Sequence, residues 1–506
     1  MRALLIKGTA MLSLNLLVDI TLTYSQTYFS KRINFFNENS NTYSFINFND
    51  TLYVPIPILQ IGDVFLAKVT INGDTLPTPR LKTGARKYIY PYAIKALNNS
   101  MYVSGPGGYY NTIQSPFFKF NTSGDTVKTT FIGDTTYYAQ IQLMANSTTK
   151  NNQLVLVGAT DSTCSTNHSS LFKLMVRCVD TNGVLIQTKL YTSCKVTGVT
   201  SVVKGDKNSY LIGYGTTLGT WDTESRVLKL DSNLNIVWDV AINNTSGGAP
   251  NIINHNDKYY MVISTKVDSV WNFTYKWERV SLTKLDLNGN IIWQRYYGVK
   301  KPYTQTSVLK QCANGDLLIC GGQQDNSVEF LAYLLRTDSL GNIKWWRNYR
   351  PITAPIQDTT AENHIYDMLE LANGDIIGVG WSGSRFLLPS QQTWLLKVDS
   401  NGCLGANNCP PNLAPPTALS QQYTPVGLTA TLYPNPASNE LTLSLSATTT
   451  TQLSITNMLG QTLHTEALQP TNHQAQLSIA HLPQGVYIVT LHNNGNSITK
   501  RLVISR

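Results

Sequence analysis

The chain has 506 residues, 42% of them hydrophobic, which is enough for two or more domains with cores of their own. Only 14% of the residues are charged, while Thr, Ser, Asn and Tyr are abundant, a profile typical of extracellular β proteins rather than cytosolic helical ones. The net charge of +9 comes without any block of Lys or Arg, which excludes the clustered basic patch of a nucleic-acid-binding protein. A weak preference for anionic glycans stays compatible with this diffuse positive charge.

Residues 1–25 are typical of a secretory signal peptide. A basic start that includes Lys7 precedes the apolar stretch Gly8–Val18, and Ser25 offers a small residue at the cleavage position. The apolar stretch is shorter than the roughly 20 residues that span a bilayer, and Asp19 interrupts it. No cysteine follows directly, so we expect no lipoprotein anchor, and no other segment is apolar enough to be transmembrane. We therefore predict export of the chain.

A short motif with an Asp-x-x-Gly turn recurs along most of the remaining sequence. Its clearest copies are KLDSNLN at Lys229–Asn235, KLDLNGN at Lys284–Asn290 and RTDSLGN at Arg336–Asn342. Seven copies, some degraded, are 51 to 61 residues apart and place the turn residue at Gly73, Gly124, Gly183, Leu234, Gly289, Gly341 and Gly402. A fixed period in this range predicts an array of units or a propeller.

A second motif precedes each of these turns. It is clearest in ANGDLLICGG at Ala313–Gly322 and ANGDIIGVGW at Ala372–Trp381. Asn-Gly between apolar runs predicts a hairpin turn, and apolar runs that do not alternate predict strands covered on both faces. Each unit then consists of four strands, which is the composition of a propeller blade. We predict an all-β fold with a seven-bladed β-propeller over residues 26–409; six or eight blades stay open because Tyr110–Thr160 is poorly marked.

The two ends of the repeat region predict how the ring closes. The last copy, KVDSNGC at Lys397–Cys403, is not followed by an outer strand. The segment YFSKRINFF at Tyr28–Phe36 resembles the outer strands IIWQRYYG and IKWWRNYR of two later units. We therefore expect this N-terminal strand to complete the last blade, which also protects the strand edges.

The Asp-x-x-Gly loop has two interpretations. A calcium loop needs several oxygen ligands within about a dozen residues, and copies such as Arg336–Asn342 supply one carboxylate. We favour a structural turn in which Asp caps the backbone and Gly or Asn adopts positive φ. Trp238, Trp293 and Trp345 follow the turn, and their fixed place favours packing over an exposed platform for sugars. We expect no metal site and no cofactor here.

Seven cysteines in an exported chain leave at least one unpaired if every disulfide is internal. Cys403 and Cys409 flank a short Gly/Asn loop and are the best candidates for a disulfide. Cys164 lies in a loop that could reach Cys194, whereas Cys178 sits one residue before a turn and cannot face Cys194. We expect no pair between the remaining cysteines, because bridged Cα atoms lie within about 7 Å.

A Pro-rich stretch without pattern, residues 410–427, predicts a linker between two domains. Residues 428–506 return to alternating apolar and polar positions, as in NELTLSLS and QLSITNMLG. Short strands and turns over this length predict a small Ig-like β-sandwich.

Three segments of this second domain resemble a known family. They are LYPNPASNELTLSL at Leu432–Leu445, ITNMLGQTL at Ile455–Leu463 and LPQGVYIVTLHNNGNSITKRLVIS at Leu482–Ser505. In this order, after a linker, they are similar to the type A C-terminal sorting domain of the type IX (Por) secretion system of Bacteroidetes. Carried over by position, the motif residues are Pro434, Asn435, Pro436, Gly460, Gly485, Tyr487, Lys500 and Arg501.

The resemblance implies a route and a destination. The chain is expected to leave the cytoplasm by Sec export and to cross the outer membrane with the type IX secretion machinery as its partner. It is then released or attached at the cell surface, commonly with removal of the sorting domain.

For the repeat region we favour a binding or adhesion module at the cell surface, with a glycan or a protein as the ligand and no chemistry of its own. No G-x-S-x-G, H-E-x-x-H, Walker or G-x-G-x-x-G motif occurs, and histidines are few. The longer insertions Trp271–Arg279 and Tyr349–Asn363 are candidate contact loops, since propellers bind through loops on one face.

The alternative is a secreted hydrolase or lyase that degrades polysaccharide at an axial site. Its carboxylates would converge from separate loops, with Asp325, Glu329, Asp358 and Glu362 as candidates. A pair of carboxylates about 5–10 Å apart is the mark of such a site. Catalysis therefore stays open, and the sequence singles out no catalytic residue.

Overall fold

The computed structural model consists of strands and connecting turns, with one 3-10 turn at Asp206–Asn208 in the part of the chain that it describes. It describes residues 28–506 apart from 34–39, 41, 59–62, 79–89, 107–114, 134–138, 162–163, 165–171, 218–222, 243–249, 272–274, 302–303, 325–329, 352–360, 385–389, 406–407, 414–429, 446–449, 459, 470–473 and 494–495. The predicted signal peptide lies outside the described residues. The all-β prediction is confirmed.

Three sheets of the repeat region contain four strands each, paired in sequence order. They are β2 (Ile46–Phe48), β3 (Thr51–Ile58), β4 (Asp63–Thr70) and β5 (Thr75–Leu76); β6 (Ala93–Leu97), β7 (Ser100–Ser104), β8 (Ser115–Phe120) and β9 (Thr126–Ile132); and β17 (Asn251–His255), β18 (Tyr259–Trp271), β19 (Tyr275–Leu285) and β20 (Ile291–Lys301). Neighbouring strands are antiparallel, because each strand turns back beside the one before it.

A seven-stranded sheet contains two further groups that share one long strand. Its strands are β10 (Ala139–Asn146), β11 (Gln153–Thr160), β12 (Phe172–Asp180), β13 (Leu185–Lys204), β14 (Tyr210–Thr217), β15 (Thr223–Leu230) and β16 (Ile236–Ala241). The first half of β13 pairs with β12, as at Tyr191 opposite Leu174, and its second half pairs with β14, as at Val202 opposite Ile212. β13 is therefore the outer strand of one four-strand group and the inner strand of the next.

An eight-stranded sheet also divides in two. Its strands are β21 (Thr304–Gln311), β22 (Leu317–Gln324), β23 (Phe330–Thr337), β24 (Ile343–Tyr349), β25 (Glu362–Glu370), β26 (Ile376–Gly383), β27 (Gln391–Val398) and the N-terminal β1 (Phe29–Ile33). One parallel residue pair, Phe330 with Glu362, joins β21–β24 to the second group. In that group β1 pairs antiparallel with β27, with Phe29 opposite Lys397. The prediction that the N-terminal strand completes the last unit is confirmed.

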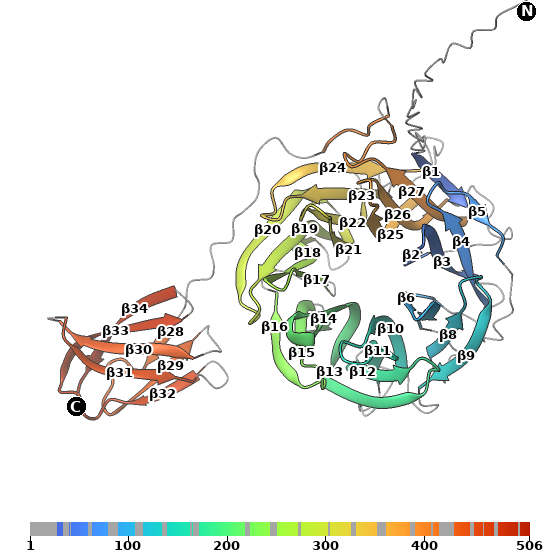
Figure 1. Cartoon of the computed structure of the whole chain (residues 1–506). Coiled ribbons are helices and arrows are strands. Elements are labelled where there is room, and N and C mark those ends of the chain that lie inside the picture. The colour runs from blue at the N-terminus through green and yellow to red at the C-terminus, as the bar shows by residue number, and fades with distance from the viewer. Residues whose placement is uncertain are drawn as a thin grey trace, which may run out of the picture.

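Figure 1 shows these groups arranged one after another around a ring. The first strand of a group, such as β2, β6, β17 or β21, lies toward the centre, and the fourth strand, such as β9, β16 or β20, lies at the rim. The dark-blue β1 lies beside β27, where the first and last parts of the ring meet (Figure 1). The inner strands therefore surround a common axis.

Neighbouring groups pack against each other through their apolar middle strands. Every residue of β26 is buried. One core cluster joins Met261 and Ile263 of β18 to Leu317 and Ile319 of β22, and all four side chains are 0% exposed. Strands with a sheet on either side have two buried faces, which explains why their apolar runs do not alternate.

The Asp-x-x-Gly loops are structural turns. In the copy that begins at Lys229, the Oδ1 atom of Asp231 accepts the backbone N–H groups of Asn233 and Asn235 at 2.9 and 2.7 Å. The residue that turns the chain has positive φ, even where it is Leu234, at 64°. The same two bonds recur at Asp180, Asp286, Asp338 and Asp399. The interpretation of the loop as a backbone cap is confirmed.

An aromatic side chain from the preceding group also packs against each of these turns and forms a hydrogen bond with it in several copies. The hydroxyl of Tyr297 donates to the carbonyl of Gly341, and that of Tyr349 to Gly402, both at 2.7 Å. A Cβ atom on Gly341 would lie 2.8 Å from the Tyr297 hydroxyl. Glycine is therefore favoured there both by its φ of +80° and by the close approach of this ring.

The recurrent tryptophans also contact the turn of the next group. Trp238 donates its indole N–H to the carbonyl of Leu287, and Trp345 to that of Ser400, each at 3.1 Å. Trp293 packs beside Gly341, where a Cβ atom would lie 3.0 Å from its ring. The packing interpretation of these side chains is confirmed.

The basic residue that opens the motif has a structural partner as well. Lys229 forms an ion pair with Asp206 at 2.5 Å, and Arg336 forms one with Asp316 at 2.8 Å. All four side chains are at most 8% exposed. In the copy that opens with Lys284, the ammonium instead lies over the ring of Tyr259, 3.6 Å from its centroid. Most of the repeated motif is therefore explained by the packing of the ring.

β1 contacts the first Asp-x-x-Gly turn of the chain, at the point where the first and last groups of the ring meet. Phe29, 6% exposed, packs against the turn residue Gly73, where a Cβ atom would lie 2.6 Å from the ring. The ammonium of Lys31 donates to the carbonyl of Gly73 at 3.4 Å. The N-terminal strand therefore packs against the first turn of the chain in the way that other outer strands pack against later turns.

The C-terminal region forms two sheets around one core. The sheets are β28 (Ala430–Tyr433), β29 (Glu440–Leu445) and β32 (Gln474–Ser478), and β31 (Thr462–Leu468), β30 (Thr451–Asn457), β33 (Gly485–Asn493) and β34 (Asn496–Ile504). Leu441 and Leu443 of the first sheet share a buried cluster with Ile455, Val489 and Leu502 of the second. Two facing sheets with a shared apolar layer are the arrangement of a small sandwich.

Candidate functional site

The inner strands enclose an axial cavity of about 890 Å³. Its wall is built mainly from β2, β6, β10, the second half of β13, β17, β21 and β25, so every four-strand group contributes. Such a volume is in the range of clefts that hold small ligands. We take this axial cavity as the candidate ligand site of the ring.

Charge in the described wall of the axial cavity comes from Lys95, Lys310 and Asp367. The Lys310 ammonium pairs with the Asp367 carboxylate at 3.1 Å. Asp367 also accepts the backbone N–H of Met368 at 2.9 Å and that of Phe45 at 3.4 Å. These contacts hold the carboxylate in place as a partner of Lys310.

Lys95 lies in the middle of β6 and lines the same cavity. Among the described residues, no acceptor lies within hydrogen-bond distance of its ammonium. Burial lowers the pKa of Lys95, the nearby charge of Lys310 lowers it further, and Asp367 only partly opposes them. The wall therefore holds a cation whose charge is poorly compensated.

A cluster of three tyrosines lines the same cavity. Tyr43 lies edge-on to Tyr92, with ring centroids 4.7 Å apart, and to Tyr366, at 5.0 Å. Tyr43 and Tyr92 lie just before inner strands β2 and β6, and Tyr366 is the middle residue of β25. Because inner strands run in the same direction along the axis, Tyr43 and Tyr92 lie toward the end of the cavity where the strands begin, and Tyr366 contacts Tyr43 from the adjoining group.

His364 connects the tyrosine cluster to residues farther from the axis. Its ring stacks on Phe330 at 4.4 Å and on Tyr366 at 5.5 Å. Its Nε2 atom lies 3.7 Å from the carboxylate of Glu362, and the interaction with this imidazole lowers the pKa of Glu362. Glu362, a candidate carboxylate of the hydrolase or lyase hypothesis, therefore lies beside a histidine side chain.

Of the remaining predicted site residues of the ring, the structure describes only some. Asp325, Glu329 and Asp358 lie outside the described residues, as do residues 352–360 of the candidate contact loop. Residues 271–279, the other candidate loop, include the paired ends of β18 and β19, where Trp271 lies opposite Tyr275. That insertion extends a hairpin.

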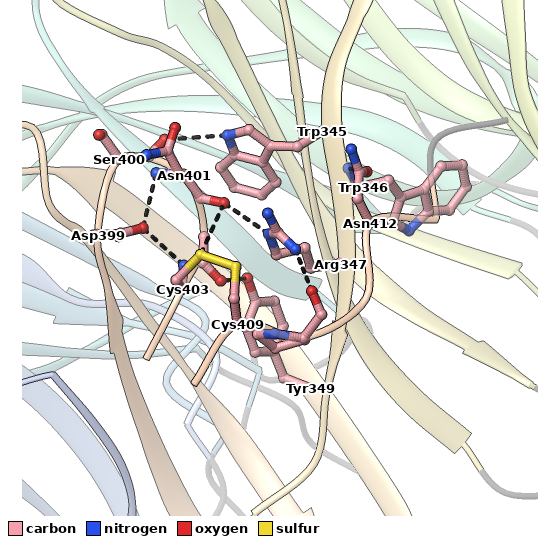
Figure 2. Close-up of a disulfide and its surroundings, with 12 residues drawn as sticks. Trp345, Trp346, Arg347, Tyr349, Asp399, Ser400, Asn401, Cys403, Cys409 and Asn412 are labelled. Atoms are coloured by element: carbon pink, nitrogen blue, oxygen red, sulfur yellow. Dashed lines mark hydrogen bonds between the residues drawn. A yellow bond between two sulfur atoms is a disulfide. The ribbon is translucent and has the colours of Figure 1, made fainter. Parts of the chain in front are cut away.

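Two disulfides hold loops to the ring. Cys164 is bonded to Cys194 in β13 with Cα atoms 5.8 Å apart, and Cys403 is bonded to Cys409 at 4.2 Å. Figure 2 shows the second bond beside Arg347 and Tyr349 of β24. Cys178, Cys312 and Cys320 are free. The disulfides fix chain segments rather than line the axial cavity.

The chain stays on the ring just beyond Cys409. Arg347 donates to the carbonyl of Pro410, Asn412 accepts the backbone N–H of Trp346 at 3.0 Å, and Leu413 donates to the Trp346 carbonyl at 2.7 Å. The first four residues of the predicted linker therefore lie along β24, and the rest of it lies outside the described residues from residue 414.

In the C-terminal domain, the Pro-Asn-Pro motif is tied to the last strand. The amide of Asn435 donates to the carbonyl of Arg501 at 2.8 Å and accepts the backbone N–H of Val503 at 2.9 Å. It lies between Pro434 and Pro436, which have no backbone N–H of their own. The Asn435 side chain thus replaces a strand partner for β34.

The other motif residues occupy a turn and the last two strands. Gly460 turns the chain with φ of +82°. Gly485 opens β33, and Tyr487, 5% exposed, donates its hydroxyl to the carbonyl of Pro483 at 2.7 Å. Lys500 is half-buried and Arg501 exposed on β34. The motif therefore combines fold-determining positions with an exposed cation.

A comparison with protein families identifies the C-terminal domain. Residues 431–505 match the model described as "Secretion system C-terminal sorting domain". The chain carries a type IX secretion sorting domain. The protein is therefore exported, to the cell surface or the medium, and its sorting domain interacts with the secretion machinery. No described helix is long and apolar enough to cross a bilayer.

Likeness to solved structures is distant. A protein of unknown function from Dyadobacter fermentans is 11% identical with a TM-score of 0.39, covering 63% of this chain and 96% of its own. The polysaccharide lyase Uly1 is 9% identical with a TM-score of 0.43, covering 71% and 90%. An apocarotenoid oxygenase from Synechocystis is 9% identical at 0.38, covering 63% and 72%. These likenesses carry no argument about function, and no curated protein matches the sequence.

Sequence reasoning missed Lys95 and the tyrosine cluster. A signal was present, because Lys95, Lys310 and Asp367 are charged residues inside the strands that precede the first hairpin turn of their groups. A charge at such a position has to face either a partner or the axis. The sequence does not distinguish the three tyrosines of the cluster from the others, since tyrosine is abundant throughout the chain.

Proposed function

We propose that the repeat region is a seven-bladed β-propeller that binds a ligand in its axial cavity at the cell surface and does no chemistry on it. Seven four-strand groups among the described residues, the shared β13 and the pairing of β1 with β27 support the blade count. The domain limits follow from it: a propeller over residues 26–409, with Pro410–Leu413 lying along β24, and a sorting domain over residues 428–506.

The observation that carries the binding function is the composition of the axial cavity. Aromatic rings at one end and a few fixed polar groups are what ligand pockets use for contact area and orientation. Its described wall has a single carboxylate, Asp367, which pairs with Lys310. A glycosidase site needs two carboxylates, one of them free to move a proton.

The propeller and its ligand can be tested together. The purified full chain is applied to a panel of glycans and surface proteins, and bound ligands are re-tested with Tyr366→Ala and with Phe131→Ala, an exposed aromatic 41% accessible on β9. We expect one class of ligand to bind, to lose at least about tenfold in affinity with Tyr366→Ala, and to be unaffected by Phe131→Ala.

The same panel is assayed for products. Degradation of a polysaccharide by the full chain would replace binding with the hydrolase or lyase hypothesis. Equal loss of binding in both variants would place the ligand away from the axis.

A further inference from the structure

The axial cavity carries one net positive charge in its described wall, from two ammonium groups and one carboxylate. Asp367 lies 3.1 Å from Lys310 and is committed to it. Lys95 is left to face the cavity without an acceptor among the described residues. The Lys95 side chain is half-buried, and an anion that enters the cavity supplies the partner that its ammonium lacks.

The surroundings of Lys95 supply further recognition groups. Thr306 and Ser307 of β21 and Thr197 of β13 line the cavity with hydroxyl groups. The tyrosine cluster offers flat apolar rings. A sugar presents both an array of hydroxyls and an apolar face, whereas a free inorganic anion uses neither the rings nor the depth of the cavity.

We propose that the axial cavity binds an acidic saccharide, with its carboxylate or sulfate group at Lys95 and a sugar ring on the tyrosine cluster. The proposal rests on the propeller binding function and names its ligand class. An acidic peptide fits less well, because an extended peptide binds along a free strand edge over several residues, and a cavity enclosed by inner strands of every group suits a short oligosaccharide.

The test uses the full chain and isothermal titration calorimetry. The probes are a trigalacturonate, its methyl-esterified neutral counterpart, a sulfated disaccharide and an acidic hexapeptide. The trigalacturonate and the sulfated disaccharide separate carboxylate from sulfate as the source of the charge. The neutral ester keeps the sugar rings and removes the charge.

Three variants isolate the ammonium. Lys95→Met removes the charge and keeps an unbranched apolar side chain, Lys95→Arg keeps the charge, and Lys128→Met removes a charge from an exposed position on β9. We expect an acidic saccharide to bind the unaltered protein at least about tenfold more tightly than the neutral ester, since a charge-assisted hydrogen bond contributes that much. Lys95→Met abolishes this preference, while Lys95→Arg and Lys128→Met retain it.

Other outcomes overturn the proposal in distinguishable ways. Equal binding of the acidic and neutral sugars, or a charge preference that survives in Lys95→Met, refutes the anion site and leaves a binding propeller. Binding of the peptide alone refutes the saccharide class. Binding of none of these probes, together with an empty ligand panel, refutes both the saccharide site and the binding function. Circular dichroism and Lys95→Arg show whether a loss reflects misfolding.

Discussion

Asp206 and Asp316 are the buried partners of the basic residue that opens the repeated motif in two of its copies. Burial alone raises the pKa of the Asp206 carboxyl, but hydrogen bonds from Lys229 and Tyr260 outweigh it, and the net pKa lies below the ordinary value of 3.8. Asp316 has a lowered pKa for the same reason, because Lys344 and Arg336 outweigh its burial. Both carboxylates are therefore more acidic in the folded chain than in the unfolded one.

Acid should destabilise the ring through these two groups. A carboxyl with a lowered folded pKa contributes its stability above the unfolded pKa and loses it as the pH falls through the folded pKa. We expect the free energy of unfolding to fall from about pH 4 downward in denaturant titrations. The double variant Asp206→Asn with Lys229→Met should show a shallower decline, and an unchanged slope would contradict the role of the pair.

The turn glycines offer a second test at the scale of single residues. Gly341 and Gly315 have φ of +80° and +86°, but a Cβ atom on Gly341 meets Tyr297 and one on Gly315 meets nothing within 4 Å. We expect Gly315→Ala to cost about 1 kcal/mol from φ alone and Gly341→Ala about 3 kcal/mol. Urea denaturation measures both. Equal costs would show that the aromatic contact contributes nothing.

Residues in the turns were predictable from the sequence, and those in the cavity were not. Asp231 and Gly341 act through their own backbone and a neighbour at fixed spacing, so repetition reveals them. Tyr43 and Tyr366 come together where the first and last groups of the ring meet, from positions more than 300 residues apart, and no period links them. Lys95 is marked in the sequence as a charge within an inner strand, but the residues that surround it come from other groups and do not show in its own repeat.

At the scale of elements, the apolar inner and middle strands were predictable and the limits of the groups were harder. The stretch Tyr110–Thr160 is poorly marked, yet it contains β8, β9, β10 and β11. β9 mixes apolar residues with polar ones such as the exposed Lys128, so a search for apolar runs does not detect this rim strand. The long β13 belongs to two groups at once, and no turn motif in the sequence marks the boundary between them.

The closing strand can be tested by single substitutions in β1. Phe29 is buried against Gly73, whereas Lys31 has a side chain 42% exposed and reaches Asp74 at 3.7 Å. We expect Phe29→Ala to lower the free energy of unfolding by about 3 kcal/mol and Lys31→Ala by less than about 1 kcal/mol. The midpoint of urea denaturation measures both. A Phe29→Ala midpoint equal to that of the unaltered chain would mean that β1 does not hold the ring closed.

At the scale of the whole molecule, transport belongs to the sorting domain, and we propose that binding belongs to the ring. Removal of residues 432–506 takes away β29 to β34, including the Asn435 contact with the last strand. We expect the truncated chain to accumulate in the periplasm while the full chain reaches the surface. Protease treatment of intact cells, followed by immunoblotting, measures this.

The ring itself provides the control for that experiment. Loss of surface protein counts as failed sorting only if the truncated chain, recovered from the periplasm, resists limited proteolysis as the full chain does. Normal surface delivery of the truncated chain would contradict the role of the sorting domain.

The hydrogen bond between Ser30 and Trp394 joins residues 364 positions apart. Strand β1 is the first described strand of the chain, and its partner β27 is the last strand of the ring. Bringing such distant segments together is entropically costly, and contacts of this range slow folding. Until β27 has emerged, β1 has no partner and the chain is an open arc with two bare edges. The ring can therefore close only once the chain as far as Val398 is available for folding, and the sorting domain follows that point along the sequence.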